Sequence, residues 1–184
     1  MSMPATLYYS AEMVRALPED GNRYETVHGE LLVSPSPRFS HQLLLQRLSF
    51  VLMKYLEATG VEGLFCVDAD ISWGPDTLVQ PDLFVADPEE LQRAQGWADI
   101  QTLHLVVEVL SPSSLRADRF TKRRLYQEQR IPAYWIIDIE NRQVEAWTPD
   151  ALFPVVERDR LTWRHPAAAA ECVIELAELF RSAT

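Results

Sequence analysis

The sequence predicts an α/β fold in which a mixed central β-sheet is flanked by α-helices. Three observations carry this prediction: apolar residues at helical spacing from His41 to about Gly60, a continuous apolar run at residues 103–110 that is typical of a buried strand, and two strand-like segments that follow a second helical segment. With 184 residues, of which 47% are hydrophobic, the chain has the size of one domain with a full core. We therefore expect a single domain over residues 1–184.

The first elements are a short helix, a hairpin and a long helix. Residues 10–17 have the pattern of a short helix, and residues 23–34 are typical of a β-hairpin that turns at a His-Gly pair. Ser40 is the expected N-cap of the long helix, which begins at His41 and ends near Gly60.

Strands and a second helix make up the rest of the chain. A turn-forming Gly-Pro-Asp sequence joins the first two of these strands, and a charged, irregular region then extends to about residue 102. A helix is expected at residues 116–129, and the tail holds weaker strands and a last helix near residues 175–181. Strands are expected at residues 64–72, 78–86, 103–110, 133–138 and 142–147.

Glu108 lies near the end of the apolar run at residues 103–110. Burying an ionised glutamate among aliphatic side chains costs several kcal/mol unless a cation or hydrogen-bond donors compensate it. Glu108 therefore needs a partner, and a metal ion or a lysine would serve.

Asp82 is the candidate carboxylate on a neighbouring strand. It follows Pro81 at the beginning of a strand, where the missing donor of proline is tolerated. If the strands at residues 78–86 and 103–110 are neighbours, Asp82 and Glu108 meet at one edge of the sheet. Two carboxylates with water suit a hard cation such as Mg²⁺ or Mn²⁺.

The helix at residues 116–129 offers a cation. Asp118, Lys122 and Tyr126 are four residues apart and line one face of this helix. Lys122 can point its ammonium group toward Glu108, where it would orient or activate a water or stabilise charge on a phosphate.

Each of these residues also has a structural interpretation. Asp82 can cap the strand that follows Pro81, Glu108 can be a strand-end residue in solvent, and Lys122 can be an ordinary solvated helix residue. Tyr126 is better explained by packing beneath the site than by action on a substrate.

The charge of the chain is unevenly distributed. The 17 basic and 27 acidic residues give a net charge of −10, the opposite of a protein that grips phosphates by bulk electrostatics. Residues 116–130 nevertheless hold six basic and two acidic side chains, so this segment is +4 and the remainder −14. We expect this helix to receive backbone phosphates through Arg116, Arg119 and Arg123.

Several motifs occur in a characteristic order between about residue 10 and about residue 150. They are His28-Gly29-Glu30, Ser34-Pro35-Ser36-Pro37 with His41, Gln80-Pro81-Asp82, Val107-Glu108-Val109-Leu110-Ser111-Pro112-Ser113, Asp118 with Lys122 and Tyr126, and Ile131-Pro132-Ala133-Tyr134-Trp135-Ile136-Ile137-Asp138. In this order they resemble the Uma-type restriction endonuclease family, which belongs to the PD-(D/E)XK nuclease superfamily. The resemblance implies a restriction endonuclease-like core and hydrolysis of DNA phosphodiester bonds.

The resemblance also implies roles for individual residues. Asp82 and Glu108 would hold a divalent Mg²⁺ or Mn²⁺, with the Val109 carbonyl as a further ligand. The superfamily's lysine normally stands two positions after the acidic residue, where this chain has Leu110. Lys122 is therefore the candidate for a migrated lysine that supports the attacking water.

Residues outside the metal pair complete the expected site. Glu30 is an additional candidate metal or water ligand, and His41 can contact a phosphate or Glu30, although capping roles would explain both. Ser111, Asp118 and Tyr126 are candidates for supporting the site or touching substrate.

Other classes of function have less support. The sequence has no Gly-x-Ser-x-Gly elbow and no glycine-rich phosphate loop, and Cys66 and Cys172 are predicted to be reduced core thiols. No apolar stretch reaches the roughly 18 residues of a membrane span, and we expect a cytoplasmic protein.

The favoured function is an Mg²⁺- or Mn²⁺-dependent DNA endonuclease acting as a homodimer. The alternative is an inactive nuclease-like domain that binds nucleic acid or a protein.

Overall fold

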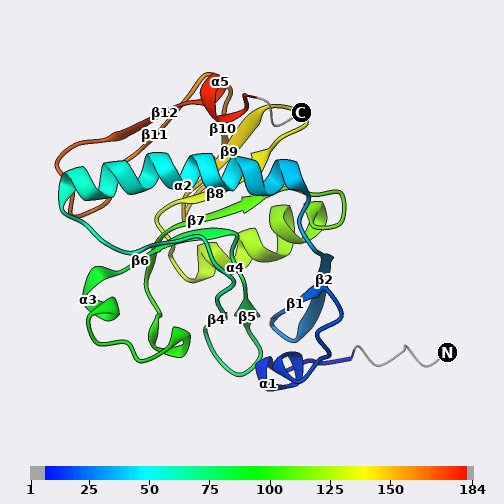
Figure 1. The fold of residues 1–184 in the computed structure, drawn as a ribbon. Coiled ribbons are helices and arrows are strands. Elements are labelled where there is room, and N and C mark those ends of the chain that lie inside the picture. Colours follow the sequence, from blue (N-terminus) through cyan, green and yellow to red (C-terminus); the bar gives the residue numbers. More distant parts are fainter. Residues whose placement is uncertain (1–6, 182–184) are drawn as a thin grey trace.

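A computed structural model describes residues 7–181, whose strands form sheets of four, six and two strands (Figure 1). No helix among these residues is long and apolar enough to cross a membrane. The largest sheet has the order β10-β9-β8-β7-β6-β3 and is mixed, because β7 and β8 are parallel and the other pairs are antiparallel. Its strands are β3 (Leu64–Phe65), β6 (Leu83–Ala86), β7 (Leu103–Val109), β8 (Tyr134–Asp138), β9 (Gln143–Trp147) and β10 (Val155–Glu157).

The register between β6 and β7 brings the start of one strand beside the end of the other. The two strands are antiparallel, and Leu83 pairs with Val107. The residue before β6 therefore lies next to the last residues of β7. This pairing confirms that the two strands proposed to carry the carboxylates are neighbours.

A helical crossover joins the parallel strands β7 and β8. It consists of a π-helical segment, η2 (Ala117–Lys122), and the α-helix α4 (Arg123–Glu128). The predicted helix at residues 116–129 is thus present, but its first part is wound more loosely than an α-helix.

The predicted hairpin forms in the expected register. β1 (Asn22–Val27) and β2 (Glu30–Pro35) are antiparallel, and Val27 pairs with Glu30 across the turn. Both turn residues have positive φ angles, 50° at His28 and 80° at Gly29, as a tight turn with the twist of a hairpin requires. With β5 (Leu78–Val79) and β4 (Ile71–Ser72), the hairpin makes the four-stranded sheet β2-β1-β5-β4.

Helices and small sheets cover both faces of the six-stranded sheet (Figure 1). The long helix α2 (Phe39–Thr59) packs on one face together with the sheet of β11 (Arg160–Trp163) and β12 (Cys172–Glu175) and with α5 (Leu176–Leu179). The other face packs against α4 and the four-stranded sheet. The remaining helices are α1 (Ala11–Arg15), α3 (Pro88–Leu91) and the 3-10 turn η1 (Trp97–Asp99).

Three local predictions are wrong. Ser40 does not cap α2, because the helix already begins at Phe39 and ends with Gly60 in the left-handed region. The strand expected at residues 78–86 is broken, because Pro81 cannot donate a ladder hydrogen bond, and its two halves join different sheets. The segment at residues 64–72 is divided likewise into β3 and β4.

The cysteine prediction is half right. Both thiols are free, and Cys172 is buried, whereas Cys66 is exposed just after the short strand β3. An apolar local sequence did not bury Cys66.

Candidate active site

Asp82 and Glu108 come together where β6 begins and β7 ends. Glu108 is the sixth residue of β7 and is 2% exposed, and Asp82 stands directly before β6 and is 7% exposed. The antiparallel register places Asp82 close enough to β7 for its Oδ2 to accept a hydrogen bond of 2.8 Å from the Val109 amide. The break at Pro81 thus positions a carboxylate beside Glu108.

Glu108 has the basic partner that its burial demands. Its Oε1 accepts hydrogen bonds of 3.0 Å from both the Lys122 ammonium and the Tyr126 hydroxyl. Burial raises the pKa of the Glu108 carboxyl well above its ordinary value, and the nearby carboxylates act in the same direction against the opposing charge of Lys122. The interpretation of Glu108 as a solvated strand-end residue is therefore wrong.

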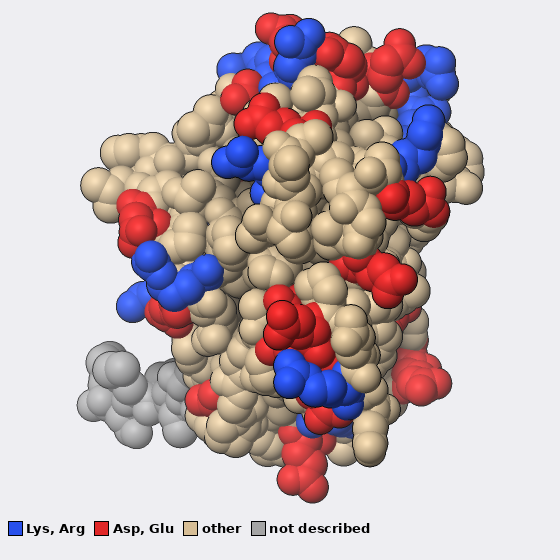
Figure 2. Space-filling model, turned by 90° about the vertical axis from the view of Figure 1, so that its left-hand side faces the viewer, with Lys and Arg blue, Asp and Glu red and all other residues tan. Residues whose placement is uncertain are grey.

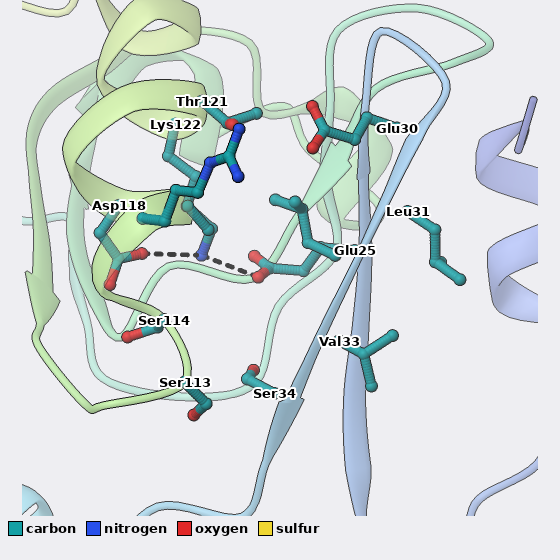
Figure 3. A pocket seen from close by; sticks show the side chains of 13 residues that line it. Glu25, Glu30, Leu31, Val33, Ser34, Ser113, Ser114, Asp118, Thr121 and Lys122 are labelled. Carbon is teal, nitrogen blue, oxygen red and sulfur yellow. Dashed lines mark ion pairs between the residues drawn. The ribbon is translucent and has the colours of Figure 1, made fainter. Parts of the chain in front are cut away.

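Lys122 lies among three carboxylates, and its side chain is 4% exposed. Its Nζ is 2.8 Å from Glu25 Oε2, 3.0 Å from Glu108 Oε1 and 3.7 Å from Asp118 Oδ1. Figure 3 shows the ammonium group between Asp118 and Glu25. Burial alone would lower the pKa of Lys122, but the three carboxylates outweigh it and raise this pKa, so the side chain is an ammonium ion at any physiological pH.

Asp118 and Lys122 lie on one buried face of the π-helical segment η2. The Arg123 amide donates to the Asp118 carbonyl, a spacing of five residues instead of four. Asp118 is 1% exposed and Lys122 3% exposed, and Tyr126 follows on the same face in α4. The predicted shared face is confirmed, and the interpretation of Lys122 as a solvated residue is wrong.

Asp82 is held by two basic side chains. Its Oδ1 accepts a 2.7 Å bond from Arg23 Nη1, and its Oδ2 lies 3.0 Å from His41 Nε2. Burial alone would raise the pKa of Asp82. The hydrogen bond and charge of His41, together with Arg23 and the Val109 amide, outweigh burial and hold this pKa well below its usual range.

Asp118 is the least compensated carboxylate of the site. Its Oδ1 is buried and has no hydrogen-bond partner among the described residues, although Lys122 is 3.7 Å away. Burial raises the pKa of Asp118 to about 6, against the opposing charge of Lys122.

Two cavities meet at this cluster. The larger, of about 660 Å³, is lined by Arg23, His41, Asp82 and Glu108, and the smaller, of about 270 Å³, by Glu25, Glu30 and Arg116 (Figure 3). Both are also lined by Ser34, Ser113, Ser114, Asp118 and Lys122. Asp118 and Lys122 therefore stand at the boundary of two openings to solvent.

Other expected site residues occupy different positions. Glu30 is exposed and lines only the smaller cavity, and His41 contacts Asp82 instead of Glu30. Ser111 lines the larger cavity, and its hydroxyl lies 3.0 Å from the hydroxyls of Ser113 and Ser114.

Two of the three arginines expected to contact phosphates have partners within the fold. Arg119 bonds Glu145 at 2.6 Å and Asp138 at 3.2 Å, because β8 and β9 bring these carboxylates beneath it. Arg123 lies over the Trp147 ring at 4.9 Å. Arg116 lines the smaller of the two cavities described above, whereas the basic groups of Arg119 and Arg123 are engaged within the fold.

Two residues of the site were missed in the sequence. Glu25 contacts Lys122, and Arg23 contacts Asp82. Both lie on β1 on the same side as Val27, which is 2% exposed, so two-residue alternation counted back from Val27 points to them.

The buried cluster is short of positive charge. Its members are Arg23, Glu25, Asp82, Glu108, Asp118 and Lys122. When all four carboxylates are ionised, they exceed the two permanent cations by two charges. The hard oxygen donors and this charge both suit a divalent cation. Within residues 7–181, however, no three His, Cys, Asp or Glu side chains are arranged to hold a metal ion.

Comparisons with known proteins agree with the fold and the motifs. The structure is similar to a solved protein from Anabaena variabilis, described as "a putative nuclease belonging to DUF820", with a TM-score of 0.76, 19% sequence identity, and coverage of 96% of this chain and 99% of that one. No curated protein matches the chain in sequence. The model of the Uma2 family, described as "Putative restriction endonuclease", matches residues 11–177. The chain therefore belongs to the Uma2 family.

Proposed function

We propose that the protein is a divalent-metal-dependent DNA endonuclease of the PD-(D/E)XK type. Family membership supports a nuclease function. The observation that carries the metal dependence is the buried cluster, in which four carboxylates face two permanent cations beside an open cavity. Ionising all four carboxylates leaves two buried negative charges in excess, which is costly without a further compensating cation.

Asp82 and Glu108 would hold the metal, with the Val109 carbonyl as a further ligand. Mg²⁺ commonly binds through one or two carboxylates and keeps several waters, so a three-residue cage is not required. When bound, the cation lowers the pKa of a coordinated water and stabilises charge on the phosphate.

Lys122 has a role that its protonation state restricts. Because three carboxylates hold the side chain as an ammonium ion, it donates hydrogen bonds and positive charge and does not accept a proton. In the proposed reaction its N–H groups orient the attacking water or meet the charge that develops on the phosphate. Tyr126 fixes Glu108 through its hydroxyl hydrogen bond.

The substrate is proposed to reach the site through the two cavities. Arg116 is exposed at the smaller one and supplies a phosphate contact. On the face shown in Figure 2, acidic side chains lie next to the basic ones, in keeping with the net charge of −10. We propose that a homodimer, with two sites facing one duplex, compensates for this weak attraction.

Plasmid nicking by the purified protein with Mg²⁺ or Mn²⁺ tests the proposal. The variants Asp82→Asn and Glu108→Gln are expected to lose at least a hundredfold in rate. Glu140→Gln is the matched control, because this exposed carboxylate lines the same cavity outside the cluster. Equal nicking by Glu108→Gln and wild type would contradict the assignment.

Two observations favour a second candidate, a nuclease-like domain that binds but does not cut. Leu110 replaces the usual lysine, and both oxygens of Asp82 already accept hydrogen bonds. Calorimetry separates the candidates: stoichiometric Mn²⁺ binding that Glu108→Gln abolishes supports the enzyme, and no binding at millimolar Mn²⁺ supports the module.

A further inference from the structure

Arg23 forms a salt bridge with Asp82, one of the two carboxylates that we propose as metal ligands. It extends from β1 into the larger cavity, and its side chain is 19% exposed. Its Nη1 donates to Asp82 Oδ1 at 2.7 Å and to the Gln80 carbonyl at 3.2 Å. A guanidinium group keeps its charge at every accessible pH. In this structure Arg23 is thus a permanent counter-cation of Asp82.

The other oxygen of Asp82 is occupied as well. Oδ2 accepts the Val109 amide at 2.8 Å and lies 3.0 Å from His41 Nε2. A cation that binds Asp82 must therefore replace existing partners. The Val109 amide is fixed in the sheet and Arg23 is on a flexible side chain, so Oδ1 is the oxygen that can be freed.

A second carboxylate stands ready to receive the guanidinium. Arg23 Nη2 already lies 3.2 Å from Asp68 Oδ1, and the Asp68 side chain is 84% exposed. Arg23 can break its bond to Asp82 and keep an ionic partner in Asp68. Leaving Asp82 therefore does not strand a buried positive charge.

We propose that Arg23 is a displaceable counter-cation, which holds Asp82 in the metal-free protein and moves toward Asp68 when a divalent cation binds. This inference rests on the proposed function, because the metal at Asp82 is part of that proposal. Arg23 is a positioning residue in this scheme: it sets the affinity for the cation by competing for Asp82. It accounts for the lack of a ready-made metal cage among the described residues, although four carboxylates lie close together there.

A merely structural role for Arg23 predicts the opposite result. If Arg23 only supported the fold, its removal would loosen the site and weaken metal binding. If it competes with the cation, its removal strengthens binding, since Asp82 then lacks a counter-charge. The direction of the change in affinity decides between the two roles.

The test is Mn²⁺ titration calorimetry of folded variants in the absence of DNA. Arg23→Met is expected to bind Mn²⁺ at least tenfold more tightly than wild type, and Arg23→Lys, which keeps the charge, to stay within about threefold of it. Arg38→Met is the matched control, because Arg38 is exposed at the same cavity. Unchanged or weaker binding by folded Arg23→Met would overturn the inference.

Asp68→Asn provides a variant that leaves the buried site intact. We expect it to weaken Mn²⁺ binding about threefold, because Arg23 loses its alternative partner. In the Arg23→Met background the same substitution should have no effect, whereas a simple loss of surface charge would weaken binding equally in both backgrounds.

The two proposals fail in different ways. If wild type binds Mn²⁺ and Arg23→Met binds it no more tightly, the proposal that Arg23 competes with the cation is contradicted. The proposal of a metal-dependent nuclease is then unaffected. If Arg23→Met alone binds, the competition is supported. If neither protein binds, both proposals fall.

Discussion

Lys122 is the common partner of three carboxylates of the site. Its ammonium group is within 4 Å of Glu25, Glu108 and Asp118, and all four residues are buried. Removing one partner from a buried ionic cluster costs more than a surface pair, because the remaining charges lose both water and counter-charge.

Lys122→Met is expected to lower the free energy of unfolding by about 3–5 kcal/mol at pH 8. Urea denaturation followed by circular dichroism measures the loss, and Lys54→Met, at an exposed position of α2, is the control. The loss should become smaller below pH 6, where Asp118 takes up a proton. A loss below about 1 kcal/mol would contradict the buried cluster.

Asp118 gives a pH dependence with a defined sign. Its pKa is about 6 in the folded protein against 3.8 as the ordinary value, so the folded state binds the proton more tightly. The free energy of unfolding therefore decreases as the pH rises from about 4 to about 6. The upper limit of this loss is about 3 kcal/mol, at about 1.4 kcal/mol for each pKa unit.

Asp118→Asn is expected to stabilise the metal-free protein by about 1–3 kcal/mol at pH 8 and to flatten its stability profile between pH 4 and pH 7. Denaturation midpoints across this range provide the measurement. Asp150→Asn, at an exposed ion pair with Arg130, should leave the profile unchanged. A profile for Asp118→Asn parallel to that of wild type would contradict the raised pKa.

At the scale of elements, the π-helical turn η2 carries two of the buried charged residues of the site. Asp118 and Lys122 are buried in it, whereas Phe120 is 61% exposed. Such widened turns are uncommon and often mark functional sites.

Deletion of Phe120 is expected to restore an ordinary α-helix and to rotate Asp118 out of the cluster. Mn²⁺ binding should fall at least tenfold, as measured by calorimetry. The substitution Phe120→Ala keeps the chain length and removes the same exposed ring, so it should bind like wild type. Equal binding by the deletion and the substitution would show that the turn does not position the site.

Local patterns were enough to find most of the elements. The hairpin, the long helix, the strand with Glu108 and the strands β8 and β9 follow from alternation, helical spacing and turn residues, which act over a few residues. The break at Pro81 was harder, because only the tertiary structure shows that β5 and β6 belong to different sheets. The π-helical turn was not predicted either, because the spacing at residues 116–129 indicates only an ordinary helix.

Site residues could be predicted where a sequence motif or helical spacing identified them. Asp82, Glu108, Lys122 and Tyr126 converge as expected. Glu25 on β1 was missed, and Glu30 was proposed instead. Glu30 follows Val27 by three positions and lies on β2, across the hairpin turn. The engagement of Arg119 with Glu145 depends on strand β9, 26 residues later, which no local pattern reveals.

For the whole molecule, paired basic residues predict weak electrostatic attraction to DNA. Eight of the 17 lysines and arginines form ion pairs with carboxylates, Arg23, Arg119 and Lys122 among them, which leaves fewer for phosphates. The affinity for DNA should therefore depend only modestly on salt, since the slope follows the number of phosphate contacts.

Arg116→Ala is expected to weaken DNA binding and to reduce the slope of log affinity against log salt by about one. Fluorescence anisotropy with Ca²⁺ as a metal that is expected not to support cleavage measures both quantities. Arg119→Ala is the matched control, since Arg119 is bound to Glu145 and Asp138. Equal changes in the two slopes would contradict the different placements of these arginines.

The parallel pairing of β7 with β8 has a consequence for the protein during its synthesis. Glu108 lies in β7, but the helix that carries Lys122 is secured against it only when β8, residues 134–138, joins the sheet. A nascent chain that ends at residue 130 holds every side chain of the cluster but lacks β8, the parallel neighbour of β7. We therefore expect the complete cluster to form only after β8 has been translated.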